Sequence, residues 1–279
     1  MANVTDAIFE KNEKVTEALE REIGADVLGL FGPIAPGVEH RVRQAIEKLP
    51  TKLTKLAIVV NTLGGSIETT ERIVSVVRHN YAEIVFIVPN LALSAGTVLA
   101  MSGDAILMNY FSCLGPIDPQ VQREGRWVPA LSYLDQFRAL TSKGTLSEAE
   151  LTLLNKLDLA ELQAFEQAKL LTEELLVKWL ANYKFKNWTK TTSKGLTVDQ
   201  AMREKRAREI AQQLNDNQRW KSHGRGIPME VLRKELNLVI EDFSGTPSLD
   251  KAIKDYSDFI GSLMAKEQLI SFVTSRSFI

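Results

Sequence analysis

The stretch that decides the fold is Leu56–Ser66, LAIVVNTLGGS, in which an apolar, β-branched run is followed at once by a polar turn with two glycines. A run of this length and composition is typical of a buried strand. A second stretch repeats the plan, because Ile84–Val88 (IVFIV) predicts another buried strand and Ala92–Thr97 (ALSAGT) follows it with small residues that open a helix. Buried strands that alternate with short turns and helices predict an α/β fold with a largely parallel sheet.

The neighbouring segments extend this alternation as far as about residue 130. We expect further strands over 25–34 and 105–108, and helices over 5–23, 37–49, 67–78 and 94–102. Beyond that point helical patterns dominate, over 131–139, 147–183, 198–214, 228–236 and around Tyr256, with a short strand over 238–243. The sequence therefore predicts an N-terminal helix (1–23), an α/β core (24–130) and a mainly helical C-terminal region (131–279), which either packs on the core or forms a unit of its own.

The composition excludes several classes of protein. The 279 residues include 34 Lys and Arg against 35 Asp and Glu, and this balance argues against a surface devoted to nucleic acid or to an anionic membrane. Cys113 is the single cysteine, so no intramolecular disulfide and no cysteine-based zinc site can form. The N-terminus lacks the apolar core of a signal peptide, and no apolar stretch reaches the roughly 18 residues that span a bilayer. We expect a cytoplasmic protein without a metal, a cofactor or a transmembrane segment.

The two turns that follow the buried strands are the candidate chemistry. At Gly64 and Gly65 the backbone can turn sharply and present bare N–H groups, which are able to stabilise an oxyanion. Ser94 stands between a strand and a helix, where helix-end N–H groups favour developing negative charge. Taken singly, each has an ordinary explanation, because glycine pairs form common turns and a serine often caps a helix.

Taken together, the two turns carry a resemblance to a known family. A glycine turn followed about thirty residues later by a serine at a helix start is similar to the superfamily of Clp peptidases and signal peptide peptidase A. With Asp104–Met108, with Gly115–Gln120 (GPIDPQ) and with the segment around His223, the chain most resembles the serine dehydrogenase proteinases. The resemblance covers roughly residues 24–121 and implies a spiral of ββα units, like that of ClpP and the crotonases. The helical patterns after residue 130 predict a helical C-terminal extension to this core.

The resemblance also implies roles for particular residues. Ser94 matches the nucleophile, while Gly64, first in the glycine pair, and Ala95 match the donors of backbone N–H groups to the oxyanion. We therefore expect an oxyanion hole built from the turn at Gly64 and Gly65 and from Ala95. The segment after Gly65 matches the part that pairs with an extended substrate peptide.

The base that would take the proton from Ser94 is an open question in the sequence. Clp peptidases place a histidine about twenty-five residues after the serine, and here Asp118 is closest to that offset. His40 and His79 fall on amphipathic helices and are expected at the surface. His223 lies in a glycine-punctuated loop, and one scheme makes it the base with Asp118 orienting it, since a Ser/His/Asp triad depends on geometry and not on chain order.

The rival scheme is a Ser/Lys dyad, as in signal peptide peptidase A. Lys143 precedes a helix that opens with the capping box Ser147-x-x-Glu150, near the offset at which that family supplies its lysine. A lysine acts as a base only after losing its charge, which burial can bring about.

We expect an ATP-independent serine endopeptidase that hydrolyses peptide bonds through an acyl-enzyme on Ser94. Its substrates would be peptides or unfolded proteins, and the fold analogy implies a homo-oligomer. Two alternatives stay open: a catalytically silent scaffold or binding module of ClpP-like fold, and an acyl-CoA enzyme of crotonase type. Arg203, Arg206 and Arg208 are interleaved with acidic residues, which indicates a solvated helix face and no nucleic-acid partner.

Overall fold

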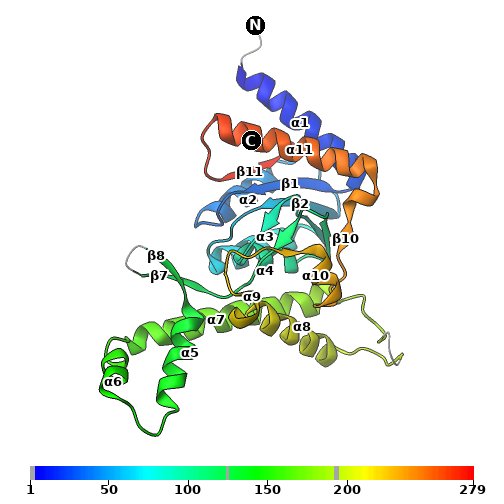
Figure 1. Ribbon diagram of the computed structural model, residues 1–279. Coiled ribbons are helices and arrows are strands. Elements are labelled where there is room, and N and C mark those ends of the chain that lie inside the picture. Colours follow the sequence, from blue (N-terminus) through cyan, green and yellow to red (C-terminus); the bar gives the residue numbers. More distant parts are fainter. Residues whose placement is uncertain (1–3, 124–125, 192–194) are drawn as a thin grey trace.

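The computed structural model describes residues 4–123, 126–191 and 195–279, and a six-stranded sheet lies at its centre (Figure 1). The strand order is β10-β5-β3-β2-β1-β11, in which all neighbours run parallel except β11, which is antiparallel to β1. The strands are β1 (Asp26–Phe31), β2 (Lys55–Asn61), β3 (Glu83–Ile87), β5 (Ala105–Met108), β10 (Glu241–Asp242) and β11 (Phe272–Ser275).

The central strands are buried on both faces, as expected for a parallel sheet covered by helices. Alternate residues such as Ile58 and Phe86 face α2 (Val38–Glu47), α3 (Ile67–Asn80) and α4 (Ala95–Met101). The intervening residues face α1 (Val4–Ile23) and α11 (Pro247–Lys266), which lie side by side over the other face (Figure 1). The apolar residues of each central strand thus belong alternately to two cores, one on each face of the sheet.

A smaller sheet lies beyond the carboxyl ends of the main strands. It contains β4 (Leu91–Ala92), β6 (Cys113–Leu114) and β9 (Ile227–Pro228), in the order β4-β6-β9, and β9 runs antiparallel to β6. Single bridges from Ile34 to Gly65 and from Thr62 to Ala92 continue it past the ends of β1 and β2. After β1, β2 and β3 the chain therefore makes a second short pairing and then enters a helix, while β5 is followed by β6 and then by a hairpin.

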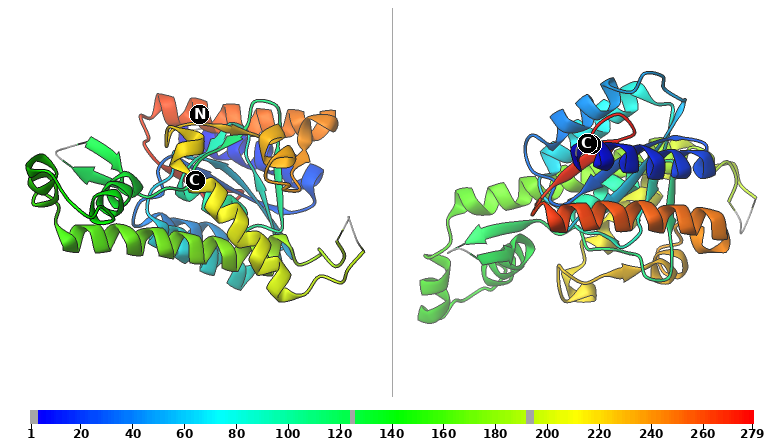
Figure 2. Two further views of the ribbon diagram at one scale, coloured as in Figure 1. Left: turned by 60° about the horizontal axis from the view of Figure 1, so that its bottom comes forward. Right: turned by 90° about the horizontal axis from the view of Figure 1, so that it is seen from above.

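The two sheets and the helices that pack on them form the body of the molecule, and an arm projects from it (Figure 2). It contains the hairpin β7 (Gln120–Arg123) and β8 (Arg126–Pro129), the helices α5 (Ala130–Thr141) and α6 (Glu148–Leu154), and the first half of α7 (Leu159–Trp179). The arm has a small apolar core of its own around Leu134 and Phe165. The second half of α7 packs on the main core through Leu176 and Trp179.

After the arm the chain returns to the body and packs on it. It passes through a π-helical turn (Leu180–Lys184), α8 (Gln200–Leu214), α9 (Asn217–Trp220) and α10 (Met229–Lys234), and a 3₁₀ turn (Phe243–Gly245) leads into α11. On α8, Arg208 pairs with Glu204 and Arg206 with Glu209. None of the helices in the described part of the chain combines the length and apolarity that a bilayer crossing demands.

Several predicted elements are confirmed, and others are wrong. The strand over 105–108 and the capping box at Ser147 occur as expected. The single helix expected over 147–183 is wrong, because the chain breaks after α6 and Asp158 caps a new helix. The strand expected over 238–243 shrinks to two residues, and β11 was not predicted. From the second half of α7 onward the helices of the C-terminal region pack on the core, whereas α5 and α6 belong to the arm, and β10 and β11 complete the main sheet.

Candidate active site

Ser94 occupies an unusual backbone position between β4 and α4. Its φ of 53° and ψ of −121° fall in a region that residues with a side chain rarely adopt, at a cost of about 1–3 kcal/mol. The amides of Thr97 and Val98 donate to the Ser94 carbonyl, so the first turn of α4 holds this conformation. The half-buried Ser94 side chain makes no capping hydrogen bond, so its hydroxyl is not used by the helix end.

The two glycines of the turn after β2 are each required by a different close approach. A Cβ added to Gly64 would lie 2.7 Å from Ser94 Cβ and 3.2 Å from the Ala95 nitrogen. A Cβ on Gly65 would lie 2.3 Å from the Ile34 carbonyl oxygen. Both residues also have positive φ, 107° and 148°. The turn therefore packs directly against the Ser94 turn on one side and against the continuation of β1 on the other.

The hydrogen bonds of this turn show which of its backbone N–H groups already have an acceptor. The Gly64 N–H donates to Thr62 Oγ1 at 3.0 Å, and the Gly64 carbonyl accepts from Ile34 N at 2.9 Å. Ser66 N donates to the Ile34 carbonyl at 2.8 Å, so by the alternation of extended backbone the Gly65 N–H points the other way, toward the segment paired with Thr62. Within the described residues, the amides of Gly65 and Ala95 have no acceptor. The geometry thus favours Gly65 over Gly64 as a donor to an oxyanion.

The segment after Gly65 is not a strand. Ser66 accepts from the Thr69 amide as the N-cap of α3, and the chain is helical from Ile67. The expectation that this segment pairs with an extended peptide is therefore limited to Gly65 and Ser66.

Thr97 is a residue of the site that the sequence analysis did not single out. Its fully buried hydroxyl donates to the Ala92 carbonyl at 2.8 Å and accepts from the Gly115 amide at 2.9 Å. These two bonds join the end of β4 to the loop that leads to Asp118. The available signal was a threonine on an otherwise small and apolar helix face, three residues after the serine.

Asp118 and His223 are 105 residues apart in the chain and meet in the structure. His223 Nδ1 lies 2.9 Å from Asp118 Oδ1, and the two side chains are 16% and 1% exposed. Asp118 Oδ2 is buried and has no donor among the described residues. The Ile117 amide donates to the Leu214 carbonyl at 3.2 Å, which ties the Asp118 loop to the end of α8.

The register of the small sheet places these groups at one end of it. Ala92 pairs with Leu114, and Leu114 pairs with Ile227 across the antiparallel contact. Ser94 comes two residues after Ala92 and Asp118 four residues after Leu114, whereas His223 comes four residues before Ile227. Because β9 runs the opposite way, all three residues emerge at the same end of their strands.

The other predicted base is held elsewhere. Lys143 lies between α5 and α6 in the arm, is half-exposed and forms an ion pair with Glu150. His40 and His79 are exposed on α2 and α3, as expected. Cys113 is half-buried, and burial raises the pKa of its thiol, so it is held in the non-nucleophilic form.

The described residues offer no group of three or more His, Cys, Asp or Glu side chains that could hold a metal ion. The chemistry available at this site is therefore that of a hydroxyl, an imidazole, a carboxylate and free backbone amides. These are the parts of an acyl-transfer site.

The chain is similar to proteins that are already known. Two uncharacterized proteins of Methanocaldococcus jannaschii are similar to the chain: one is 28% identical over 213 residues, which cover 74% of this chain and 70% of that protein. The other is 25% identical over 211 residues, which cover 75% and 68%. The family described as ClpP-like SDH-type serine proteinase matches residues 27–221, a range that contains both glycines of the turn, Ser94 and Asp118 and ends two residues before His223. This match covers more than half of the chain and confirms the resemblance and the ClpP-like α/β fold predicted from the motifs, so the chain belongs to the ClpP-like SDH-type serine proteinase family.

Proposed function

We propose that this protein is an ATP-independent serine endopeptidase whose catalytic triad is Ser94, His223 and Asp118. The observation that carries the proposal is the bond of 2.9 Å between His223 and Asp118, at the end of the small sheet where Ser94 also emerges. Neighbouring strands lie about 4.8 Å apart, so β4 and β9 are separated by about 10 Å. Among the described residues no hydrogen bond joins the Ser94 hydroxyl to His223, and in our proposal this bond forms when substrate binds, as catalytic hydrogen bonds often do.

The hydrogen bond fixes the role of each ring nitrogen. A carboxylate oxygen only accepts, so His223 Nδ1 donates to Asp118 Oδ1 and carries the ring proton. His223 Nε2 then has a free lone pair and can accept the proton of the Ser94 hydroxyl. Asp118 orients the ring and stabilises the imidazolium that this transfer creates.

The first half of the reaction forms the acyl-enzyme. Ser94 Oγ attacks the carbonyl carbon of the scissile bond as its proton passes to His223 Nε2, and the carbonyl oxygen becomes an oxyanion. The N–H groups of Gly65 and Ala95 are free to donate to this oxyanion, and Ala95 adds the positive end of α4. The C–N bond then breaks, and His223 returns the proton to the leaving amine.

The second half repeats these steps with water. His223 Nε2 takes a proton from a water molecule, whose oxygen attacks the ester carbon, and the same two amides hold the new oxyanion. The bond to Ser94 Oγ breaks, the serine recovers its proton from His223, and a carboxylic acid leaves. Electrons and protons balance without any cofactor.

Lys143 is the weaker candidate for the base. A lysine that acts as a base is held uncharged by burial, whereas Lys143 is half-exposed in the arm and pairs with Glu150. His223 is 16% exposed and bonded to a carboxylate that is almost fully buried, which is the environment that a general base requires.

The competing functions make less use of the site. An acyl-CoA enzyme of crotonase type would use the two amides for a thioester enolate and would have no need of the serine or of the pair Asp118 and His223. A silent scaffold would have no need of the strained backbone at Ser94. As further parts of the proposal, the substrates are peptides or unfolded proteins, the protein assembles as a homo-oligomer, and it resides in the cytoplasm, where a single free cysteine is ordinary.

Labelling with a fluorophosphonate tests the proposal directly. The reagent bonds to an activated serine Oγ with loss of fluoride, so mass spectrometry of the wild type should place the label on Ser94. Ser94→Ala should abolish labelling and lower peptide hydrolysis by at least about 10³-fold. Ser75→Ala, which removes an exposed hydroxyl on α3, is the matched control and should label normally. Absence of label on the wild type, or labelling that survives in Ser94→Ala, would refute the peptidase.

A further inference from the structure

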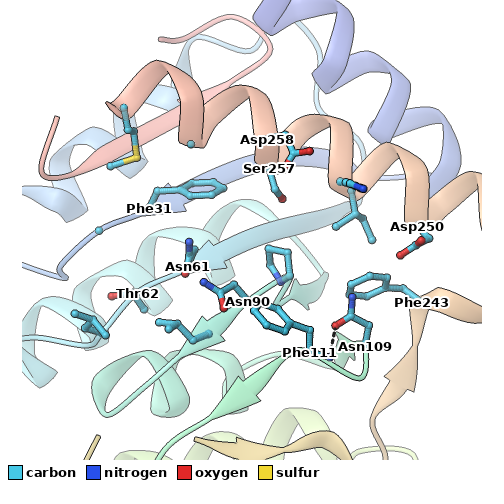
Figure 3. A pocket seen from close by; sticks show the side chains of 18 of the residues that line it. Phe31, Asn61, Thr62, Asn90, Asn109, Phe111, Phe243, Asp250, Ser257 and Asp258 are labelled. Atoms are coloured by element: carbon cyan, nitrogen blue, oxygen red, sulfur yellow. Dashed lines mark hydrogen bonds between the residues drawn. The ribbon is translucent and has the colours of Figure 1, made fainter. Parts of the chain in front are cut away.

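A large cavity lies between α11 and the carboxyl ends of the main strands (Figure 3). Its volume of about 1180 Å³ exceeds that of most ligand sites, which are about 300–1,000 Å³. Its floor comes from the residues at which β1, β2, β3 and β5 turn into the small sheet, and its roof comes from α11. Ser94, His223 and Asp118 are not among its lining residues, so it is a site distinct from the triad.

The cavity nevertheless begins next to the nucleophile. Leu63 lines it, and the following residue, Gly64, packs against Ser94 Cβ. Leu91 also lines it, three residues before Ser94, and its carbonyl accepts from the Thr62 amide at 3.0 Å. An extended chain advances about 3.3 Å per residue, so a polypeptide bound at Ser94 reaches the cavity within about three residues.

The outer part of the cavity is apolar and open to solvent. Leu63 is 72% exposed, Tyr110 87% and Phe111 65%, although all three are large apolar or aromatic side chains. Three such side chains around one hollow form a patch of the kind that marks a binding surface. They favour a ligand that carries bulky apolar groups.

The inner part of the cavity carries polar groups without partners. The side-chain amides of Asn61 and Asn90 point into it from neighbouring strand ends, and within the described residues neither makes a hydrogen bond (Figure 3). Across from them, Ser257 Oγ on α11 is buried and likewise unpartnered. Each carboxamide offers both a donor and an acceptor, which is what a peptide group needs and what a hydrocarbon chain cannot use. The roof adds charged side chains from α11, and an apolar rim combined with amide and charged walls fits a polypeptide better than a lipid chain; the charged residues are Asp250, Lys254 and Asp258.

We propose that this cavity is a specificity subsite of the peptidase, which holds the substrate polypeptide about three residues from the scissile bond and accepts a large apolar side chain there. This inference rests on the proposed function for its substrate. Leu63 and Phe111 contact the apolar side chain, while Asn61 and Asn90 hydrogen-bond the adjacent peptide groups. Affinity for extended substrates therefore depends on a residue remote from the bond that is cut.

Gly261 offers a way to fill the cavity from its roof. It lines the cavity on α11, and a Cβ built on it meets no atom within 4 Å, so Gly261→Trp adds bulk without disturbing the helix. Lys251→Trp is the matched control, because Lys251 is exposed on the same helix and does not line the cavity. Both substitutions are introduced into the Ser94→Ala protein, so that binding is measured without turnover.

The probe is a fluorescein-labelled decapeptide in which leucine or phenylalanine stands three residues from a central site, compared with the same peptide carrying serine there. We expect fluorescence anisotropy to show at least tenfold weaker binding of the apolar peptide to the Gly261→Trp protein and unchanged binding to the Lys251→Trp protein. The serine peptide should bind weakly to all three proteins. Equal affinity of the apolar peptide for the Gly261→Trp protein and its parent would overturn the subsite.

A second readout uses the active enzyme. Cleavage sites in a denatured protein, mapped by mass spectrometry, should be enriched in large apolar residues about three positions from the cut for the wild type, and Gly261→Trp should erase the enrichment and raise KM more than it lowers kcat. A wild type that takes the fluorophosphonate label but shows the same cleavage pattern as Gly261→Trp refutes the subsite alone. A wild type without the label refutes the peptidase, while peptide binding still decides the cavity.

Discussion

The body and the arm of this molecule are built on different principles. In the body, the central strands are buried on both faces, and even charged groups such as Asp104 and Arg78 are enclosed and paired. In the arm, the described apolar core is a handful of residues around Phe165, and leucines such as Leu153 and Leu159 are exposed. The body therefore buries far more apolar surface than the arm, so we expect the body to be the more stable of the two.

The candidate triad straddles these two regions. Ser94 and its glycine turn belong wholly to the body, where each close contact is fixed by backbone hydrogen bonds. Asp118 stands at the point where the chain leaves for the arm, and His223 stands in the loop after its return. The proposed nucleophile and oxyanion donors thus lie wholly within the body, while the proposed base depends on how the chain leaves the body and re-enters it.

The largest expected effect concerns this division. His223→Ala should lower kcat for peptide hydrolysis by about 10³–10⁴-fold, because the proton of Ser94 loses its acceptor, while KM changes little. His79→Ala, at an exposed histidine of the body, and Lys143→Ala, in the arm, should each retain activity within about threefold. Full activity in His223→Ala together with its loss in Lys143→Ala would transfer the base to the arm.

The next effect compares the apolar core of the body with that of the arm. Phe86→Ala, at a fully buried position of β3, should lower the free energy of unfolding of the body by about 4 kcal/mol. Phe165→Ala should loosen the arm without shifting the main urea transition, and hydrogen exchange should quicken in α5 and α7 alone. Equal shifts of the main transition in the two variants would show that the arm and body unfold as one unit.

A smaller effect concerns buried charge in the body. Burial of Asp104 favours its neutral form, but bonds from Lys186, the Ile84 amide and Arg78 outweigh it and hold the pKa of this carboxyl below its usual value. A pKa lower in the folded than in the unfolded chain means stability that is present at neutral pH and lost as the pH falls below about 4.

Asp104→Ala should therefore lower the free energy of unfolding by about 3 kcal/mol at pH 7, measured with urea. This difference from the wild type should shrink toward pH 3. Asp135→Asn, at an exposed position of the arm, should change stability at neither pH. A deficit in Asp104→Ala that is equally large at both pH values would mean that packing, and not charge, is what the variant loses.

Much of the body could be predicted because its signals are local. The strand at Ala105–Met108 and the helix after Ser66 follow from runs of apolar residues and from a cap within a few positions. The pairing of β11 with β1 could not be predicted, because it joins segments more than 240 residues apart. In addition, Phe272–Ser275 carries only a short apolar pattern. The break before Asp158 had a local signal, a polar residue that caps a helix, inside a stretch with helical spacing on both sides.

The candidate site divides in the same way. Ser94 and the glycine pair were found through their position after buried strands, and Asp118 with His223 was one of two schemes that the sequence left open. Which glycine amide is free depends on the direction of each N–H, and that is set by the Ile34 backbone, about thirty residues away. Thr97 bonds two backbone partners, Ala92 on β4 and Gly115 in the loop after β6, which no spacing rule brings together.

The positive φ of Ser94 has a consequence for the history of such proteins. Glycine adopts this conformation without strain, so a lineage released from selection for cleavage would gain stability by losing the hydroxyl at this position. In the proposed peptidase Ser94 therefore trades stability for a hydroxyl, and Ser94→Gly should raise the free energy of unfolding while it removes that hydroxyl.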